Sequence, residues 1–243
     1  MPVVAVSAVI GLGLLLLPGH SEDARRAGAP PERVPAPVVA PSAEAATQPV
    51  PPRHSTTDPT SPWVVVNKTH PITPLDFRPD VAIVRGYQVA TVAAAPLTRL
   101  LDASDRAGLG FKIASAFRSY DYQRQVHDAT VAARGRVQAD LVSARPGHSE
   151  HQTGLAVDLV TPADPRCSFD PCFARTPGGR WLARHAWRHG FVVRYRAGDE
   201  DVTGYRPEPW HLRYVGVELA AELRRSGTTT LEEHFGVAGG TYR

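Results

Sequence analysis

An aspartate lies inside an apolar segment that has the character of a buried β-strand. Residues 155–160 read LAVDLV, so aliphatic side chains flank Asp158 on both sides. An ionised carboxylate in such surroundings carries a large desolvation cost unless it is paired with a cation or binds a metal. The fold must therefore bring either an arginine or a metal ion next to Asp158, and this requirement limits how the chain can be arranged.

A histidine precedes this strand at a spacing that allows two arrangements. His151 lies seven residues before Asp158 in the segment SEHQTGLAVD, residues 149–158. In one continuous helix, seven residues make about two turns and would bring both side chains to one face. Gly154 lies between them and permits a sharp turn of the backbone, so a loop histidine can instead fold back over the strand. We expect His148 to be near enough to support the site without being a ligand.

A second cluster, EPWHLRY at residues 208–214, supplies the groups that the first cluster lacks. His211 lies at the head of a predicted strand, and Glu208 precedes it by three residues. Two histidines and one carboxylate are a usual zinc-binding set, and three protein ligands leave a fourth position for water. We therefore predict that His151, Asp158 and His211 bind Zn²⁺ and that Glu208 is the general base for the attacking water.

Each of these residues also has a simpler explanation when it is considered alone. Asp158 could pair with an arginine, His151 could be an ordinary core or surface histidine, and Glu208 could be an exposed loop acid. A further histidine pair, His185 and His189, has the i, i+4 spacing of one helix face. Because the glutamate of an HExxH motif is missing between them, we assign this pair to a solvated helix face.

The N-terminal quarter of the chain differs in composition from the rest. Residues 3–17 form an uncharged apolar run, shorter than a membrane-spanning helix and typical of the core of a signal peptide. No Lys or Arg precedes this run, so we expect either a start further upstream or an uncleaved anchor. Residues 19–62 are rich in Pro, Ala, Ser and Thr and nearly free of large apolar side chains, which predicts a disordered spacer. We therefore divide the chain into a signal peptide or membrane anchor (1–18), this spacer (19–62) and one catalytic domain (63–243).

Helical and strand periodicities are mixed along the domain. Helices are predicted over 92–107, 121–134, 179–190 and 217–225, and strands over 111–117, 155–160, 191–195 and 210–214. The apolar segment 63–67 is either a strand or an anchoring segment. The regular βαβ alternation of a parallel sheet is missing, so the predicted fold class is α+β, with a mainly antiparallel central sheet flanked by helices in a single domain.

The two cysteines indicate the compartment. Cys167 and Cys172 are separated by four residues, and no second pair of Cys or His residues lies nearby to complete a structural zinc site. In an oxidising compartment so close a pair is expected to form a small disulfide loop. Together with the apolar N-terminal run, this predicts a secreted or membrane-anchored protein that faces outward, in the cell wall.

The charge of the chain bears on its partners. The formal net charge is +3, and no basic cluster alternates with aromatic residues. Nucleic-acid binding is therefore not expected. We expect a monomer, with the N-terminal segment as a membrane tether.

The two motifs resemble the signatures of a known family. SEHQTGLAVD and EPWH are similar to the paired SxHxxGxAxD and ExWH motifs of the VanY-type D-alanyl-D-alanine carboxypeptidases, zinc peptidases that also include D-Ala-D-Ala dipeptidases and some phage endolysins. Segments 66–72, 115–123, 179–191 and 203–216 also resemble this family, so the similarity covers nearly all of residues 63–220. The resemblance implies the zinc ligands and the base that are named above.

The resemblance also implies contacts with the substrate. The segment FRSYDYQ, residues 117–123, matches the family pattern YRSYxxQ, with Phe117 in place of the tyrosine. It implies that Arg118 contacts the terminal carboxylate or the developing oxyanion of the substrate, that Gln123 lines the pocket, and that Ser149 is a pocket residue. A planar guanidinium suits a carboxylate because it can donate two parallel hydrogen bonds.

These residues together predict a hydrolase, a zinc-dependent D,D-carboxypeptidase that removes the terminal D-alanine from peptidoglycan stem peptides. L,D-carboxypeptidase, D-Ala-D-Ala dipeptidase or endopeptidase activity on the same scaffold stays open, because specificity depends on the shape of the pocket. A non-catalytic peptidoglycan-binding module with a structural zinc is a further alternative. The presence of Glu208 and the open fourth ligand position argue against it.

Overall fold

The computed structural model describes residues 54–242. The predicted anchor (1–18) and most of the predicted spacer (19–62) lie outside these residues. Within the described part of the chain, no helix has both the length and the apolar character needed to cross a membrane.

A four-stranded antiparallel sheet with the strand order β3-β4-β6-β5 lies at the centre of the fold. Its strands are β3 (Lys112–Ser115), β4 (Ala156–Val160), β5 (Phe191–Tyr195) and β6 (Glu208–Tyr214). All three pairings are antiparallel, which confirms the predicted α+β class. The register places Ser115 opposite Asp158 and Asp158 opposite His211, so these residues form one row across the sheet.

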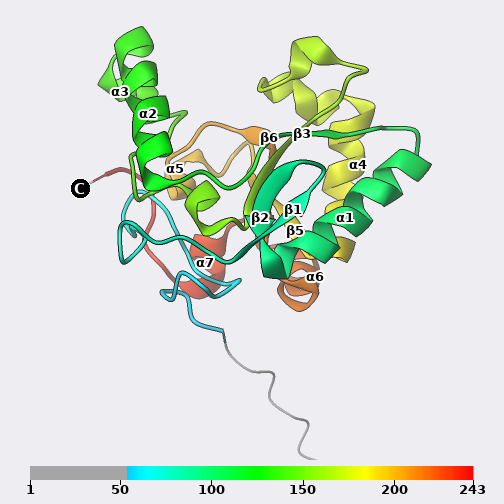
Figure 1. Ribbon diagram of the computed structural model, residues 1–243, viewed down its shortest axis with the longest axis horizontal. Coiled ribbons are helices and arrows are strands. Elements are labelled where there is room, and N and C mark those ends of the chain that lie inside the picture. The colour runs from blue at the N-terminus through cyan, green and yellow to red at the C-terminus, as the bar shows by residue number, and fades with distance from the viewer. Residues whose placement is uncertain (1–53, 243) are drawn as a thin grey trace, which may run out of the picture. The chain divides into compact units, whose positions relative to one another are not determined.

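Helices surround this sheet (Figure 1). They are α1 (Thr91–Arg106), α2 (Tyr120–Arg134), α3 (Arg136–Ala139), α4 (Pro177–His185), α5 (Glu200–Thr203), α6 (Val217–Ser226) and α7 (Leu231–Phe235), with single 3₁₀ turns η1 (Glu150–Thr153), η2 (Pro165–Cys167), η3 (Pro171–Arg175) and η4 (Ala186–His189). The four predicted helices are confirmed, but the segment 179–190 divides into α4 and η4. The 3₁₀ turn tightens the end of the helix before Gly190, which is left-handed and ends it.

The helix α2, which lines the cleft described below, has a defined cap at each end. The hydroxyl of Ser119 accepts a hydrogen bond from the backbone N–H of Tyr122 (3.2 Å). Gly135 follows the last turn with a φ of 75°, a conformation that glycine adopts without steric cost.

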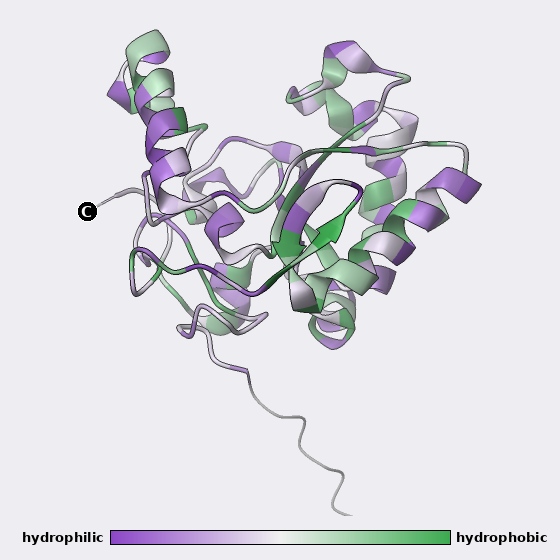
Figure 2. Cartoon of the chain, in the orientation of Figure 1, coloured by the Kyte–Doolittle hydropathy of each residue, from purple (hydrophilic) through white to green (hydrophobic). Residues whose placement is uncertain are grey.

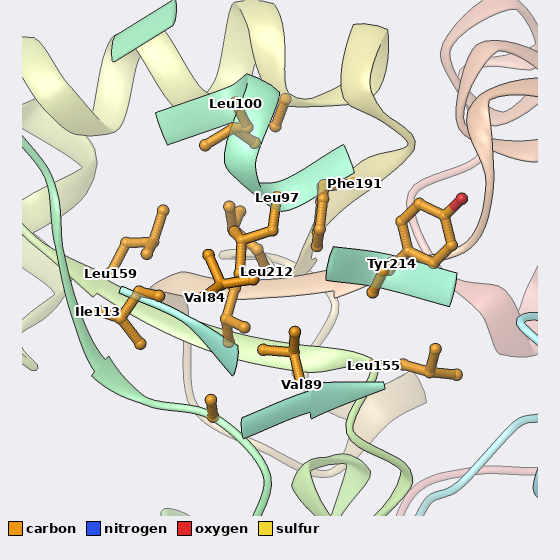
Figure 3. Close-up of a cluster of buried hydrophobic side chains, with 14 of the residues drawn as sticks. Val84, Val89, Leu97, Leu100, Ile113, Leu155, Leu159, Phe191, Leu212 and Tyr214 are labelled. Atoms are coloured by element: carbon orange, nitrogen blue, oxygen red, sulfur yellow. The ribbon is translucent and has the colours of Figure 1, made fainter. Parts of the chain in front are cut away.

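The two faces of the central sheet have opposite character. One face is apolar and packs against the amphipathic helix α1, along which hydrophobic and hydrophilic residues alternate (Figures 2 and 3). The side chains that meet there include Val157, Leu159 and Leu212 from the sheet and Leu97 and Leu100 from α1. Successive side chains of a strand point to opposite faces, so Asp158, His211 and Arg213 lie on the other face. These three residues are also buried, and the sheet therefore separates the apolar core from a layer of charged groups.

A hairpin of β1 (Val81–Val84) and β2 (Tyr87–Ala90) is an element that the periodicity of the sequence does not predict. Each strand has four residues, too few for a clear alternation. The connection Arg85-Gly86 has positive φ at both positions (49° and 90°), as a two-residue hairpin turn requires. The hairpin contributes Val84 and Val89 to the core (Figure 3).

The folded domain begins before Trp63, where the sequence predicts that the spacer ends. The ring of His54 packs edge-on against Trp63, with 4.9 Å between the ring centroids. The backbone N–H of Val65 donates to the carbonyl of Thr56 (2.9 Å). The segment 63–67 is not a strand, although most of it is buried, because its backbone groups bond to local turns and side chains and to no strand. Residues 54–62 are thus part of the domain.

Gly154 makes the turn that returns the chain from η1 into β4. Its φ is 69°, and its carbonyl accepts the backbone N–H of Ala90 at the end of β2 (2.8 Å). A Cβ atom at this position would lie 2.7 Å from the nitrogen of Ala90. The expectation of a sharp turn here is confirmed, and the close approach of two backbone segments adds a second reason for glycine.

We predict that Gly154→Ala lowers the free energy of unfolding by about 3 kcal/mol. Positive φ costs an alanine about 1 kcal/mol, and displacing the hairpin adds about 2 kcal/mol. Gly108→Ala is the matched control, because Gly108 has a φ of 72° with no atom within 4 Å of its Cβ position, and we expect a loss of about 1 kcal/mol there. Urea unfolding of both variants measures the difference. Equal losses in the two variants would contradict the close approach at Gly154.

Candidate functional site

Three side chains with metal-binding atoms converge on the charged face of the sheet. His151 comes from η1, Asp158 from β4 and His211 from β6, and their ligand atoms all lie within 4.8 Å of one another. His151 Nε2 lies 3.2 Å from Asp158 Oδ2, and His211 Nδ1 lies 3.2 Å from Asp158 Oδ1. The fold thus brings together the three residues that the sequence predicts as zinc ligands.

The other nitrogen of each imidazole is held by an acceptor. His151 Nδ1 lies 2.7 Å from the carbonyl oxygen of Ala116, and His211 Nε2 lies 3.4 Å from Glu150 Oε2. When each of these nitrogens donates its proton to the acceptor, His151 Nε2 and His211 Nδ1 are left to face Asp158. Such contacts fix the tautomer and the orientation of histidines that bind metals.

The surroundings of Asp158 show whether a metal ion fits among these three side chains. Its Oδ1 is buried and accepts no hydrogen bond from the described residues, because the contact to His211 Nδ1 lacks hydrogen-bond geometry. Burial would raise the pKa of Asp158, but His151 and His211 hold it well below its ordinary value. An ionised carboxylate with an unsatisfied oxygen beside two imidazoles matches the donor set that zinc prefers. The residues therefore fit a zinc ion.

Glu208, the predicted general base, is the first residue of β6. The strand begins two residues before the predicted segment 210–214, because Glu208 pairs with Tyr195 of β5. Its Oε2 lies 3.6 Å from His211 Nδ1. Burial raises the pKa of Glu208 to about 7, and the nearby charge of Asp158 also raises it. A carboxylate with a pKa near neutrality is suited to both accepting and returning a proton.

These groups line a cleft of about 880 Å³. The cleft also contains Arg118, Gln123 and Ser149, the three predicted substrate contacts. The amide nitrogen Nε2 of Gln123 donates a hydrogen bond to the carbonyl of Ala144 (2.6 Å). Its Oε1 accepts no hydrogen bond from residues 54–242. All the predicted site residues thus face one cavity, and their roles toward zinc and substrate stay predictions.

Two other histidines from the sequence analysis, His148 and His185, make contacts away from the predicted zinc ligands. His148 does not support the ligands, because its Nδ1 contacts the carbonyl oxygen of Asn67 (2.8 Å) and its ring packs edge-on against Tyr242 (5.2 Å between centroids). His185, the last residue of α4, contacts the guanidinium of Arg188 in η4 (2.8 Å).

The predicted pair Cys167–Cys172 forms a disulfide, which confirms that prediction. The bond closes the loop between η2 and η3, and residues of this loop line the cleft.

A buried network of charged side chains contacts His211, and the sequence analysis does not predict it. Glu150 Oε1 accepts hydrogen bonds from Arg194 Nε (2.8 Å) and from Arg213 Nη1 (2.7 Å). Burial would raise the pKa of Glu150, but the two arginines hold it well below its ordinary value. Arg194 also pairs with Glu232 of α7 (2.7 Å). The sequence does contain one sign of this network, since the apolar strands FVVRY and WHLRY each include an arginine, Arg194 and Arg213.

The pKa of the predicted ligand His211 depends on this network. Burial lowers the pKa of an imidazole, but the carboxylates of Asp158 and Glu150 raise that of His211 to about 9. A zinc ion that binds at this imidazole would compete with a proton for the same nitrogen.

Two imidazoles, an ionised carboxylate and a buried acid of raised pKa line one cleft, and such a set of groups fits a metal-dependent hydrolase. Comparison with known families agrees with this class. The chain belongs to the VanY D-alanyl-D-alanine carboxypeptidase family, whose model matches residues 86–217. The family resemblance of the SEHQTGLAVD and EPWH motifs is thereby confirmed.

Individual relatives extend this comparison. The chain is 40% identical over 143 residues to the putative carboxypeptidase YodJ of Bacillus subtilis, which is 59% of this chain and 52% of that protein, so it spans about half the length of that relative. It resembles the solved LdcB LD-carboxypeptidase with a TM-score of 0.65 and 33% identity, covering 75% of this chain and 89% of that one. It also resembles a mutant of the VanY D,D-pentapeptidase in complex with Zn(II), with a TM-score of 0.62 and 31% identity over 72% of this chain and 99% of that one.

We predict that zinc raises the thermal unfolding midpoint of the metal-free protein. Zinc at a hundredfold excess over its Kd adds about 2.7 kcal/mol, or roughly 8 °C for a domain of this size. His211→Ala removes a ligand and is expected to abolish the shift. His185→Ala is the matched control, since that histidine lies outside the cluster, and it should retain the full shift. An equal shift in His211→Ala would contradict the assigned ligands.

Proposed function

We propose that the protein is a zinc-dependent D,D-carboxypeptidase that removes the terminal D-alanine from peptidoglycan stem peptides outside the membrane. The family supports peptidase activity of the carboxypeptidase type. The choice of a free C-terminus as the recognised group rests on one observation, the state of Arg118.

Arg118 places a positive charge in the cleft without a partner that satisfies it. Among the described residues, its guanidinium makes one hydrogen bond, to the hydroxyl of Ser115 (3.3 Å). Burial lowers the pKa of Arg118, while Asp158 and Glu208 raise it. A largely desolvated guanidinium with free N–H groups is suited to bind a carboxylate through two hydrogen bonds. The terminal carboxylate of a peptide supplies that group beside the bond to be cleaved.

The catalytic roles follow from this placement. A zinc ion held by His151, Asp158 and His211 would polarise the scissile carbonyl and lower the pKa of the attacking water. Glu208 accepts the proton of this water and returns it to the leaving amine of the terminal residue. Arg118 holds the terminal carboxylate, so the scissile bond lies one residue away from the end of the peptide.

The disulfide supports the proposed location. Bonds such as Cys167–Cys172 persist in oxidising compartments and are rare in the cytosol. An extracytoplasmic location would bring the cleft to its proposed substrate in the cell wall. The membrane tether and the monomeric state stay predictions.

L,D-carboxypeptidase activity is a second candidate. It is favoured by the similarity to the LdcB LD-carboxypeptidase, which has a TM-score of 0.65. The same ligands and base could cleave the D-alanine of a tetrapeptide, because the configuration of the preceding residue is selected by the walls of the cleft. Purified protein incubated with tri-, tetra- and pentapeptides, followed by mass spectrometry, separates the two. Loss of one D-alanine from the pentapeptide supports D,D activity, and cleavage of the tetrapeptide alone would replace it by L,D activity.

We predict that Glu208→Gln lowers kcat on the pentapeptide by a factor of about 10² to 10⁴, because the amide cannot accept the proton of the water. The glutamine has nearly the same size, so the thermal shift on adding zinc should persist. Steady-state kinetics and the zinc-dependent unfolding midpoint are measured on the same preparation. Activity equal to that of the wild type would refute the assigned base.

We predict that Arg118→Ala lowers kcat/KM on the pentapeptide about 100-fold, since a hydrogen-bonded charge partner is lost. The wild type should discriminate against the same peptide with an amidated C-terminus, and the variant should not. Arg124→Ala is the matched control, because Arg124 forms a surface ion pair with Asp121 of α2 (3.2 Å). If Arg118→Ala kept the preference for the free acid, carboxylate recognition by Arg118 would be excluded.

A further inference from the structure

The loop closed by the Cys167–Cys172 disulfide forms a wall of the cleft. Phe169 and Asp170 of this loop line the same cavity as the predicted zinc ligands. Figure 1 shows α2 and α3 on one side and the segment that precedes α4 on the other side of β3 and β6. The cleft is lined from both sides, and nothing in the proposed catalytic steps uses the disulfide loop.

Phe169 is held in an unfavourable conformation. Its φ is 55°, a left-handed backbone that bulky residues rarely adopt, and its side chain remains 53% exposed. The ring packs edge-on against Trp210, which lies between the predicted base and the ligand His211, with 5.9 Å between the centroids. Strained residues of this kind persist where the surroundings fix them, and they cluster at ligand-binding positions. The disulfide fixes the loop and presents an apolar ring to the cleft.

Asp170 places a negative charge next to this ring. Its Oδ1 accepts the backbone N–H of Cys172 (2.7 Å), which orients the carboxylate. The side chain is exposed and forms no ion pair with another described residue. An apolar ring followed by a free carboxylate is complementary to a side chain with an aliphatic stem and a terminal ammonium group.

The position of this wall indicates which part of a substrate reaches it. A cleft of about 880 Å³ has room for much more than the two residues that flank a scissile bond. If Arg118 holds the terminal carboxylate, the rest of the peptide must run outward between the walls. This direction of the bound peptide rests on the proposed function, in which Arg118 binds the terminal carboxylate.

We propose that Phe169 and Asp170 form a specificity subsite for a residue on the N-terminal side of the cleaved bond. Phe169 packs against the aliphatic stem of its side chain, and Asp170 pairs with the ammonium group at its end. The disulfide holds both residues in place.

Steady-state kinetics with two pentapeptides test this subsite. The peptides end in D-Ala-D-Ala and differ only in a lysine before these residues, which is free in one and Nε-acetylated in the other. The wild type is expected to show a KM about threefold lower for the free lysine, the size of an exposed charge pair. Asp170→Asn still accepts the Cys172 N–H, and we expect it to lose the difference while kcat stays unchanged.

Further variants separate the ring from the charge. Phe169→Ala should raise KM about fivefold for both peptides, because the contact with the stem is lost. The double variant Cys167→Ser, Cys172→Ser should raise KM similarly, a change that a purely stabilising disulfide would not produce. Val137→Ala is the control, since this α3 side chain is 76% exposed and lies outside the cleft lining, and its KM should equal that of the wild type.

The outcomes are distinguishable. Wild-type KM values in both Asp170→Asn and Phe169→Ala, with normal turnover, would overturn the subsite and leave the proposed function intact. A wild-type protein that hydrolyses neither peptide would overturn the proposed function itself.

Discussion

The rest of the site depends on one buried carboxylate, that of Glu150. Its side chain is fully buried, and its charge is balanced by Arg194 and Arg213, which reach it from neighbouring strands. Arg213 also donates to the carbonyl of Val64 (2.6 Å), and Arg194 pairs with Glu232 of α7. One carboxylate thus connects η1, the sheet, the first folded segment and the last helix. An unpaired buried charge costs several kcal/mol, so displacing any of these parts would leave a costly charge without its partner.

The same carboxylate connects this framework to the chemistry. Glu150 Oε2 faces His211 Nε2, so the group that organises the charged layer also directs His211 Nδ1 toward Asp158. The neighbouring residue in the chain, His151, is directed by a backbone carbonyl of the segment after β3. Orientation of the predicted ligands is therefore a property of the packed domain and does not require the metal to impose it.

The sequence predicted the central sheet, the long helices and the site residues because each produces a local pattern. LAVDLV, FVVRY and the capped segment after Ser119 carry their periodicity and boundaries in a few adjacent residues. The ion network was missed because its members are separated by 38 and 63 positions and meet only in the folded chain. The polar residues 54–62 resemble a spacer in composition, yet the ring of His54 and the backbone carbonyl of Thr56 contact residues 63–65 of the domain. His148 has the right proximity in sequence, but its side chain turns to Asn67.

The row formed by Ser115, Asp158 and His211 has a consequence for folding fidelity. Asp158 faces the charged layer only while β4 is paired with β6 in the native register, Asp158 opposite His211. A slip of one residue would invert every side chain of β4, turning Asp158 into the leucine-rich core and Leu159 toward the cleft. Misregistered chains would have neither the paired carboxylate nor a complete set of donors. The pairing of β4 with β6 thus sets the apolar core and the candidate site at once, so an error in one is an error in the other.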